Sequence, residues 1–165
     1  MERLRVDAAG PDEARALLAR CCGSTRWVDR MLSRRPFGSL EAMLSAARDE
    51  WLTLSRSDWL EAFATHPRIG DREALRRRFG DGRDLPAREQ AGIADASERI
   101  LSALAEGNAA YERKFGFIFI VCATGLKADE MLSMLRARIA NDPDQELQIA
   151  AGEQAKITAL RLANL

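Results

Sequence analysis

The chain has 165 residues, 47% of them hydrophobic, and its 25 Lys and Arg residues are balanced by 25 Asp and Glu residues. This length fits one domain, and a net charge of zero gives no overall field to attract nucleic acid or an anionic membrane. We therefore expect a single soluble domain over residues 1–165, with no nucleic-acid or membrane partner.

The cysteines and the N-terminus indicate a reduced, cytoplasmic protein. Cys21 and Cys22 are adjacent and Cys122 is remote, which is neither a disulfide framework nor the spacing of a zinc site. The first residues lack the long apolar core of a signal peptide, and no run approaches the ~18 apolar residues of a membrane span. With one histidine and scattered cysteines we expect no metal site, and there is also no phosphate-binding loop or dinucleotide fingerprint.

Apolar residues recur at helical spacing through most of the chain, which predicts an all-α fold of about eight or nine helices. Ser39 is placed to cap one helix, and Asp142, Pro143 and Gln145 form the pattern of a capping box at the start of the last. The expected helices are residues 11–22, 25–34, 39–54, 57–65, 86–106, 108–122, 128–140, and 142 to the C-terminus.

Two segments are less regular. Residues 115–122 are aromatic and β-branched and would suit a buried strand, but no second strand is available to pair with them. We therefore interpret this segment as the end of a buried helix, or as a helix that unwinds. Residues 70–86 form the one long polar interruption, and we expect a loop there that borders a site.

His66 is the only histidine and is therefore the first candidate for proton transfer near neutral pH. It precedes Pro67, which ends the helical pattern and places the imidazole at a helix C-terminus, where the helix dipole favours the protonated ring. A histidine at a helix end is also common for structural reasons. The spacing alone leaves both interpretations open.

Other candidates are weaker when taken alone. Glu89 and Gln90 fall in the first turn of an expected helix, where they can orient a polar ligand or simply satisfy the helix dipole. Arg161 lies between leucines and either faces a pocket or extends to water. If the helix over 108–122 ends early, the freed backbone of residues 119–123 can bind a planar polar ligand. A thiol nucleophile at Cys122 is disfavoured because its apolar neighbours would raise the thiol pKa.

Several motifs, taken in order, are together more specific than any one of them. They are residues 35–37, 66–70, 88–92, Asn108 with Tyr111, 114–123, and 156–157 with 160–162. This ordered set resembles the decarboxylases of 2-oxo-4-hydroxy-4-carboxy-5-ureidoimidazoline (OHCU), which form (S)-allantoin in urate breakdown. The resemblance extends from about residue 10 to the end of the chain.

The resemblance implies an all-helical homodimer that decarboxylates this small ureidoimidazoline without metal or organic cofactor. By position, it implies that His66 and Glu89 are catalytic, with His66 in proton transfer and Glu89 orienting the substrate. It also implies that Arg161 anchors an oxygen of the substrate. The remaining implied contacts are Pro67, Pro86, Gln90 and the backbone of Phe119, Ile120, Val121, Cys122 and Ala123.

One position departs from the family pattern. Pro86 occupies the slot where the family usually has a serine, and proline offers no hydroxyl to the helix or to a ligand. Two alternatives therefore stay open: a helical binding module whose site has decayed, and a lyase or hydrolase for another ureido compound.

Overall fold

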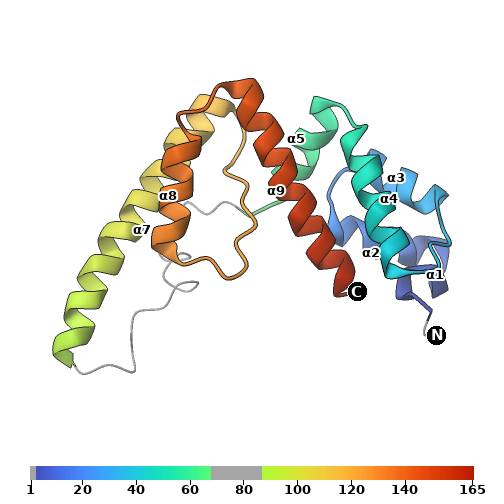
Figure 1. Ribbon diagram of the computed structural model, residues 1–165, viewed down its shortest axis with the longest axis horizontal. Helices are drawn as coiled ribbons and strands as arrows, with labels where there is room; N and C mark the ends of the chain where they lie inside the picture. Colours follow the sequence, from blue (N-terminus) through green and yellow to red (C-terminus); the bar gives the residue numbers. More distant parts are fainter. Residues whose placement is uncertain (1–2, 68–86) are drawn as a thin grey trace. The chain divides into compact units, whose positions relative to one another are not determined.

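The computed structural model describes residues 3–67 and 87–165, and for residues 87–97 it describes the backbone alone. Over this part of the chain there are eight helices and no strand, so the all-α prediction is confirmed (Figure 1). The chain packs as two compact units, Met1–His66 with Ile149–Leu165, and Pro67–Gln148. The expectation of a single domain stays a prediction.

The first unit contains five N-terminal helices and most of the last helix. The N-terminal helices are α1 (Arg5–Ala8), α2 (Pro11–Cys21), α3 (Thr25–Ser33), α4 (Leu40–Leu52) and α5 (Arg56–Ala64). Four of them begin and end within two residues of the predicted bounds, whereas α1 was not predicted. Helix α3 packs against α2, α4 and α5.

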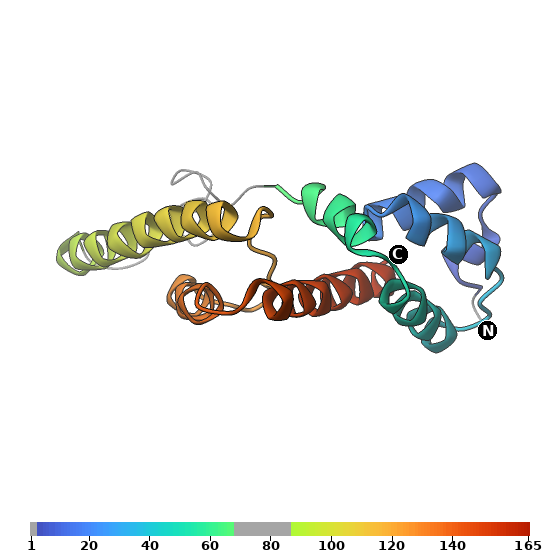
Figure 2. The same cartoon turned by 90° about the horizontal axis from the view of Figure 1, so that it is seen from above.

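Three buried tryptophans hold this unit together. Trp27 Nε1 donates to the carbonyl of Ala47, and Trp59 Nε1 donates to that of Trp51, both at 3.0 Å. Trp51 Nε1 donates to the carbonyl of Ala151 at 2.9 Å, which fixes α4 against α9 (Pro143–Ala163) (Figure 2). Each ring is buried while its one polar group is satisfied, as a stable core requires.

Side-chain caps start the helices where the sequence indicates. Ser39 Oγ accepts a hydrogen bond from the Ala42 N–H at 3.1 Å at the start of α4. Asp142 Oδ2 accepts one from the Gln145 N–H at 3.3 Å at the start of α9. Both predicted N-terminal caps are confirmed.

The second unit contains α7 (Ala87–Phe115), α8 (Ala128–Arg138) and the first residues of α9. Helix α7 is continuous, so the predicted break between residues 106 and 108 is wrong. Gly107 is instead a point of close approach: a Cβ there would lie 2.6 Å from Leu135 Cδ2 of α8. The glycine that suggested a break in the helix is instead required for the close packing of α7 against α8.

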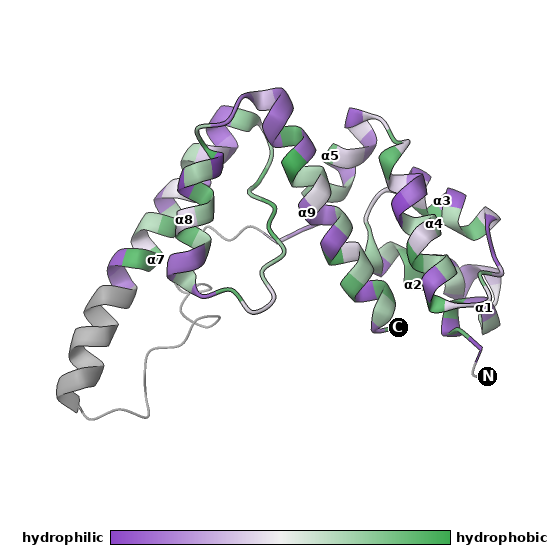
Figure 3. Cartoon of the chain, viewed as in Figure 1, coloured by the Kyte–Doolittle hydropathy of each residue, from purple (hydrophilic) through white to green (hydrophobic). Residues whose placement is uncertain are grey.

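The segment between α7 and α8 is not helical, so the prediction of a helix to residue 122 is wrong, whereas the alternative of a helix that unwinds is confirmed. Helix α7 ends at Phe115, and Gly116 follows with φ of 81°, a left-handed conformation that favours glycine. Residues 118–123 have no regular secondary structure. Figure 3 shows this segment in the colours of apolar residues, and Phe119, Ile120 and Val121 are buried. The hydrophobic side chains of this segment are therefore explained by its burial without a helical conformation.

No helix among the described residues is both long enough and apolar enough to cross a membrane.

Candidate active site

His66 lies just beyond the C-terminal end of α5, as its position before proline predicts. Its backbone N–H donates to the carbonyl of Phe63 at 3.2 Å, and Thr65 caps the helix. The imidazole is half-buried, whereas Pro67 is exposed.

A buried glutamine fixes the ring of His66. Gln154 of α9 is fully buried, and its Oε1 lies 2.5 Å from His66 Nε2, while its Nε2 donates to Thr158 Oγ1 at 3.1 Å. Because Gln154 presents its carbonyl oxygen to the ring, Nε2 carries the proton and Nδ1 has the free lone pair in the neutral form. The atom of His66 left to exchange a proton with a ligand is therefore Nδ1.

Opposing effects act on the pKa of His66. Burial lowers its pKa below the ordinary value, and the nearby Arg161 charge lowers it further, although the hydrogen bond to Gln154 acts in the opposite direction. The helix end favours the protonated ring, but burial and Arg161 act the other way and lower the net pKa. At neutral pH the ring is a neutral base.

Arg161 shares a face of α9 with the two residues behind His66. Gln154, Thr158 and Arg161 follow the spacing i, i+4, i+7, which repeats on one side of a helix. Arg161 Nη1 lies 3.4 Å from the carbonyl of Arg20 and 3.5 Å from that of Cys21. Among the described residues it has no carboxylate partner within ion-pair distance, so its charge is available to an anion.

The remaining candidates belong to the second unit. Glu89 and Gln90 are the third and fourth residues of α7, so their predicted place in a first helical turn is confirmed for the backbone. Their side chains, and all of Pro86, lie outside the described residues. The structure thus brings His66 and Arg161 together, and it describes residues 119–123 within the other unit.

Residues 119–123 have backbone donors with no acceptor among the described residues. Among the described groups, the Ile120 carbonyl accepts from Arg138 Nη1 at 2.7 Å, and the Ala123 carbonyl accepts from the Leu126 N–H at 3.0 Å. No N–H of this segment donates to a described acceptor. A row of free amides beside buried apolar rings is suited to a planar ligand rich in carbonyl groups.

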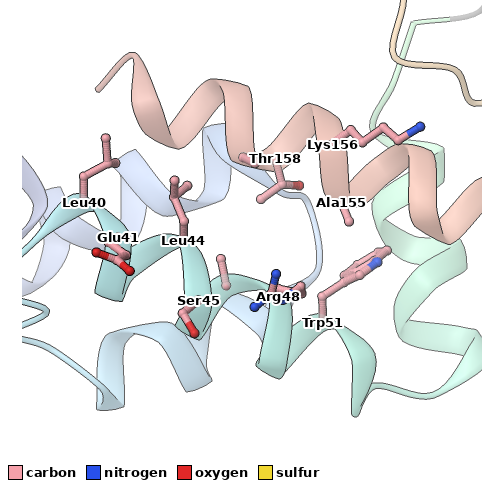
Figure 4. A pocket seen from close by; sticks show the side chains of 11 residues that line it. Leu40, Glu41, Leu44, Ser45, Arg48, Trp51, Ala155, Lys156 and Thr158 are labelled. Carbon is pink, nitrogen blue, oxygen red and sulfur yellow. The ribbon is translucent and has the colours of Figure 1, made fainter.

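A hollow of about 890 Å³ lies in the first unit between α4 and α9 (Figure 4). Its walls include Leu44 and Trp51 of α4 and Ala155 and Thr158 of α9. None of the predicted site residues lines it. It touches the candidate site only through Thr158, the residue that holds Gln154.

Sequence reasoning missed the polar residues that support the site. Gln154 and Thr158 were not singled out, although their helical spacing to Arg161 was readable. Arg138, Tyr111 and Glu146 form a buried charged cluster whose members are far apart in sequence, and no local pattern predicts it.

Comparison with known proteins gives one consistent result. The family model described as OHCU decarboxylase matches residues 7–163. The uric acid degradation bifunctional protein TTL of Arabidopsis thaliana is 43% identical over 146 residues, which are 88% of this chain and 45% of that protein. An OHCU decarboxylase of Xenopus laevis is 29% identical over 81% of this chain and 75% of its own length. This chain thus spans less than half of the bifunctional plant protein.

Solved structures agree in fold. A crystal structure of an OHCU decarboxylase in the presence of (S)-allantoin has a TM-score of 0.70 and 36% identity, covering 94% of this chain and 97% of that one. A structure of (S)-allantoin synthase has the same TM-score at 18% identity, which supports the fold alone. The match of the family model to residues 7–163, almost the whole length, establishes that this chain belongs to the OHCU decarboxylase family.

Proposed function

We propose that this chain decarboxylates OHCU to (S)-allantoin and carbon dioxide in urate degradation. The observation that carries the proposal is a half-buried neutral histidine, held by Gln154 beside Arg161, which has no carboxylate partner among the described residues, in a chain of the OHCU decarboxylase family. A base next to a cation suits a substrate that is both a carboxylate and a proton donor.

The substrate's own structure explains how the reaction proceeds without a cofactor. The ring carbon that bears the carboxylate also bears a hydroxyl, and its neighbour, which bears the ureido group, is part of a C=N bond. When carbon dioxide leaves, the electron pair of the broken bond forms a C=C bond between these carbons. The C=N electrons move to the ring nitrogen, which takes a proton. The hydroxyl then loses its proton, the C=O bond forms, and a proton adds to the ureido-bearing carbon.

The enzyme must therefore position the ring, stabilise the developing charge and deliver one proton to one face. In our proposal His66 transfers protons through Nδ1, and Glu89 orients the substrate hydroxyl or ureido group. Arg161 binds an anionic or carbonyl oxygen of the substrate. Gln90, Pro67 and the backbone of residues 119–123 contact the ureido and ring amides, and Pro86 borders the site without a hydroxyl to offer.

The test uses substrate made in place, because OHCU is unstable. Urate oxidase and hydroxyisourate hydrolase, both in excess, convert urate to OHCU, and circular dichroism follows the appearance of (S)-allantoin with and without this protein. We expect rapid formation of the chiral product, and we expect His66→Ala to lower turnover by roughly two to four orders of magnitude.

Far-UV circular dichroism must first show that His66→Ala is folded. Racemic product formed at the spontaneous rate by folded wild-type protein would reject the decarboxylase. Rapid chiral product that persists unchanged in His66→Ala would keep the activity but remove His66 from it.

We further propose that the protein is a cytoplasmic homodimer. The dimer rests on the family resemblance, and the compartment rests on the cysteines. Burial raises the pKa values of Cys21 and Cys22 to about 11, so both remain thiols at neutral pH. A midpoint of thermal unfolding that rises with protein concentration is the expected signature of the dimer.

A further inference from the structure

The side chain of Arg138 makes one contact that its buried ion pair does not require. Arg138 is the last residue of α8 and is 7% exposed. Its Nε and Nη2 bind Glu146 Oε1 at 2.7 and 2.6 Å, which neutralises the charge. Its third nitrogen, Nη1, turns to the backbone and donates to the Ile120 carbonyl at 2.7 Å.

The surroundings hold this guanidinium in place. Glu146 is fully buried and also accepts from the hydroxyl of Tyr111 at 2.5 Å and from Asn141 Nδ2 at 3.0 Å. The guanidinium carbon of Arg138 lies 4.5 Å from the centre of the Phe119 ring. Because each group of this buried network restrains the others, the direction of Nη1 is fixed.

The segment that receives this bond has no regular secondary structure to fix its backbone. It leaves the helical path at Gly116, and the bond from Arg138 ties its Ile120 carbonyl to the end of α8. The bond uses an acceptor of the segment, and no N–H of residues 119–123 donates to a described acceptor. Arg138 thus restrains the backbone without using any of its donors.

We propose that Arg138 is a positioning residue, which holds the backbone of residues 119–123 in the conformation that reads the amide groups of the substrate. The proposal rests on the proposed function, because that function supplies the ligand of this backbone. Lysine cannot replace arginine here, since one ammonium lacks the planar fork that reaches Glu146 and the Ile120 carbonyl together.

The first readout is independent of activity. In the full-length protein, ¹⁵N relaxation of the amides of residues 117–123 measures the order of the segment. We expect order parameters S² near the rigid-backbone level of about 0.85 in the wild type. In Arg138→Lys we expect S² of the segment to fall toward about 0.6. The second readout is the coupled allantoin assay, in which we expect Arg138→Lys to raise KM about tenfold with kcat changed less than about twofold.

Two controls separate positioning from a structural role. Tyr111→Phe removes the hydroxyl that donates to Glu146 and accepts from Arg138 Nη2 at 3.5 Å, but it leaves the bond from Arg138 Nη1 to Ile120. Stability should therefore fall while segment order and KM stay at wild-type values. Arg136→Lys makes the same exchange at an exposed position of α8 and should change nothing. If Arg138→Lys does not fold, the double variant Arg138→Met with Glu146→Leu removes both buried charges together, and we expect it to fold.

Equal loss of order in Tyr111→Phe, or unchanged order in the Arg138 variants, would overturn the positioning role. A disordered segment with an unchanged KM would overturn its link to substrate binding. If the wild type produces no chiral allantoin, the proposed function fails, and with it the substrate link, while the relaxation data still decide whether Arg138 orders the segment.

Discussion

His66 is a neutral base in this structure because burial and a neighbouring cation outweigh the hydrogen bond from its ring to Gln154. Burial and Arg161 lower its pKa, and the carbonyl oxygen of Gln154 raises it. Since the net pKa is below 6.5, the acid limb of the kcat/KM profile should lie below pH 6.5. Replacing the amide oxygen by a carboxylate should move this limb.

We expect Gln154→Glu to shift the acid limb of the pH profile upward by about one to two units, because an opposite charge in contact stabilises the imidazolium. The measurement is kcat/KM for OHCU against pH, with both coupling enzymes in excess at every pH. Gln148→Glu is the matched control, since it adds the same charge at an exposed position of α9. An equal shift in both variants would show that only net charge matters, and no shift in Gln154→Glu would separate Gln154 from the catalytic ring.

The same pKa makes stability depend on pH, with a definite sign. Because the folded pKa of His66 lies below the unfolded value, the unfolded chain takes up a proton first as the pH falls. The contribution of His66 to stability is therefore complete above the unfolded pKa and is lost as the pH falls from about 6.5 toward the folded pKa.

At this scale the sequence allowed the proposed site groups to be recognised better than the residues that support them. His66 is the single histidine, and Arg161 is a charge in an apolar helix end, so both are visible in the printed chain. Gln154 and Arg138 are meaningful only because of what they touch, at separations of 88 and 18 residues. Such contacts depend on tertiary packing, which a local pattern does not encode.

At the scale of elements, the end of α7 is decided by one glycine. Gly116 has φ of 81°, and a Cβ built on it meets no atom within 4 Å. The only cost of a side chain there is the left-handed conformation, which is about 1–2 kcal/mol for an L-residue. Gly152, within α9, also has an open Cβ position but no positive φ, so a side chain there should stabilise the helix and not strain it.

We expect Gly116→Ala to lower the free energy of unfolding by about 1–2 kcal/mol and Gly152→Ala to raise it by about 0.5–1 kcal/mol. Urea denaturation followed by far-UV circular dichroism measures both. If Gly152→Ala were destabilised, the added methyl group would have to clash with a neighbouring group. A neutral Gly116→Ala would show that the chain can leave α7 by another route.

Most helix bounds follow from sequence because apolar spacing and caps such as Ser39 and Asp142 are local signals. The errors fall at Gly107 and Gly116, where one residue type has two different roles. Gly107 permits close packing against Leu135 inside a continuous helix, whereas Gly116 ends that helix. Only the neighbouring helix and the backbone angle distinguish them.

At the scale of the whole molecule, the open question is whether the two compact units unfold together. Trp27, Trp51 and Trp59 are the only tryptophans in the chain, and all belong to the first unit. Tryptophan fluorescence therefore reports that unit alone, whereas far-UV circular dichroism reports the helices of both. Helix α9 has its first residues in one unit and the rest in the other, so melting it affects both.

We expect thermal unfolding monitored by the two signals to give coincident midpoints, because a continuous helix shared by two units couples their stability. Both midpoints should also rise with protein concentration if the protein is a homodimer. Gly152→Ala serves as the control: it lies in the first unit, yet in a cooperative molecule it must raise both midpoints equally. A fluorescence midpoint that moves alone would mean that the unit carrying His66 and Arg161 unfolds independently of the unit carrying residues 119–123, and the single-domain prediction would be wrong.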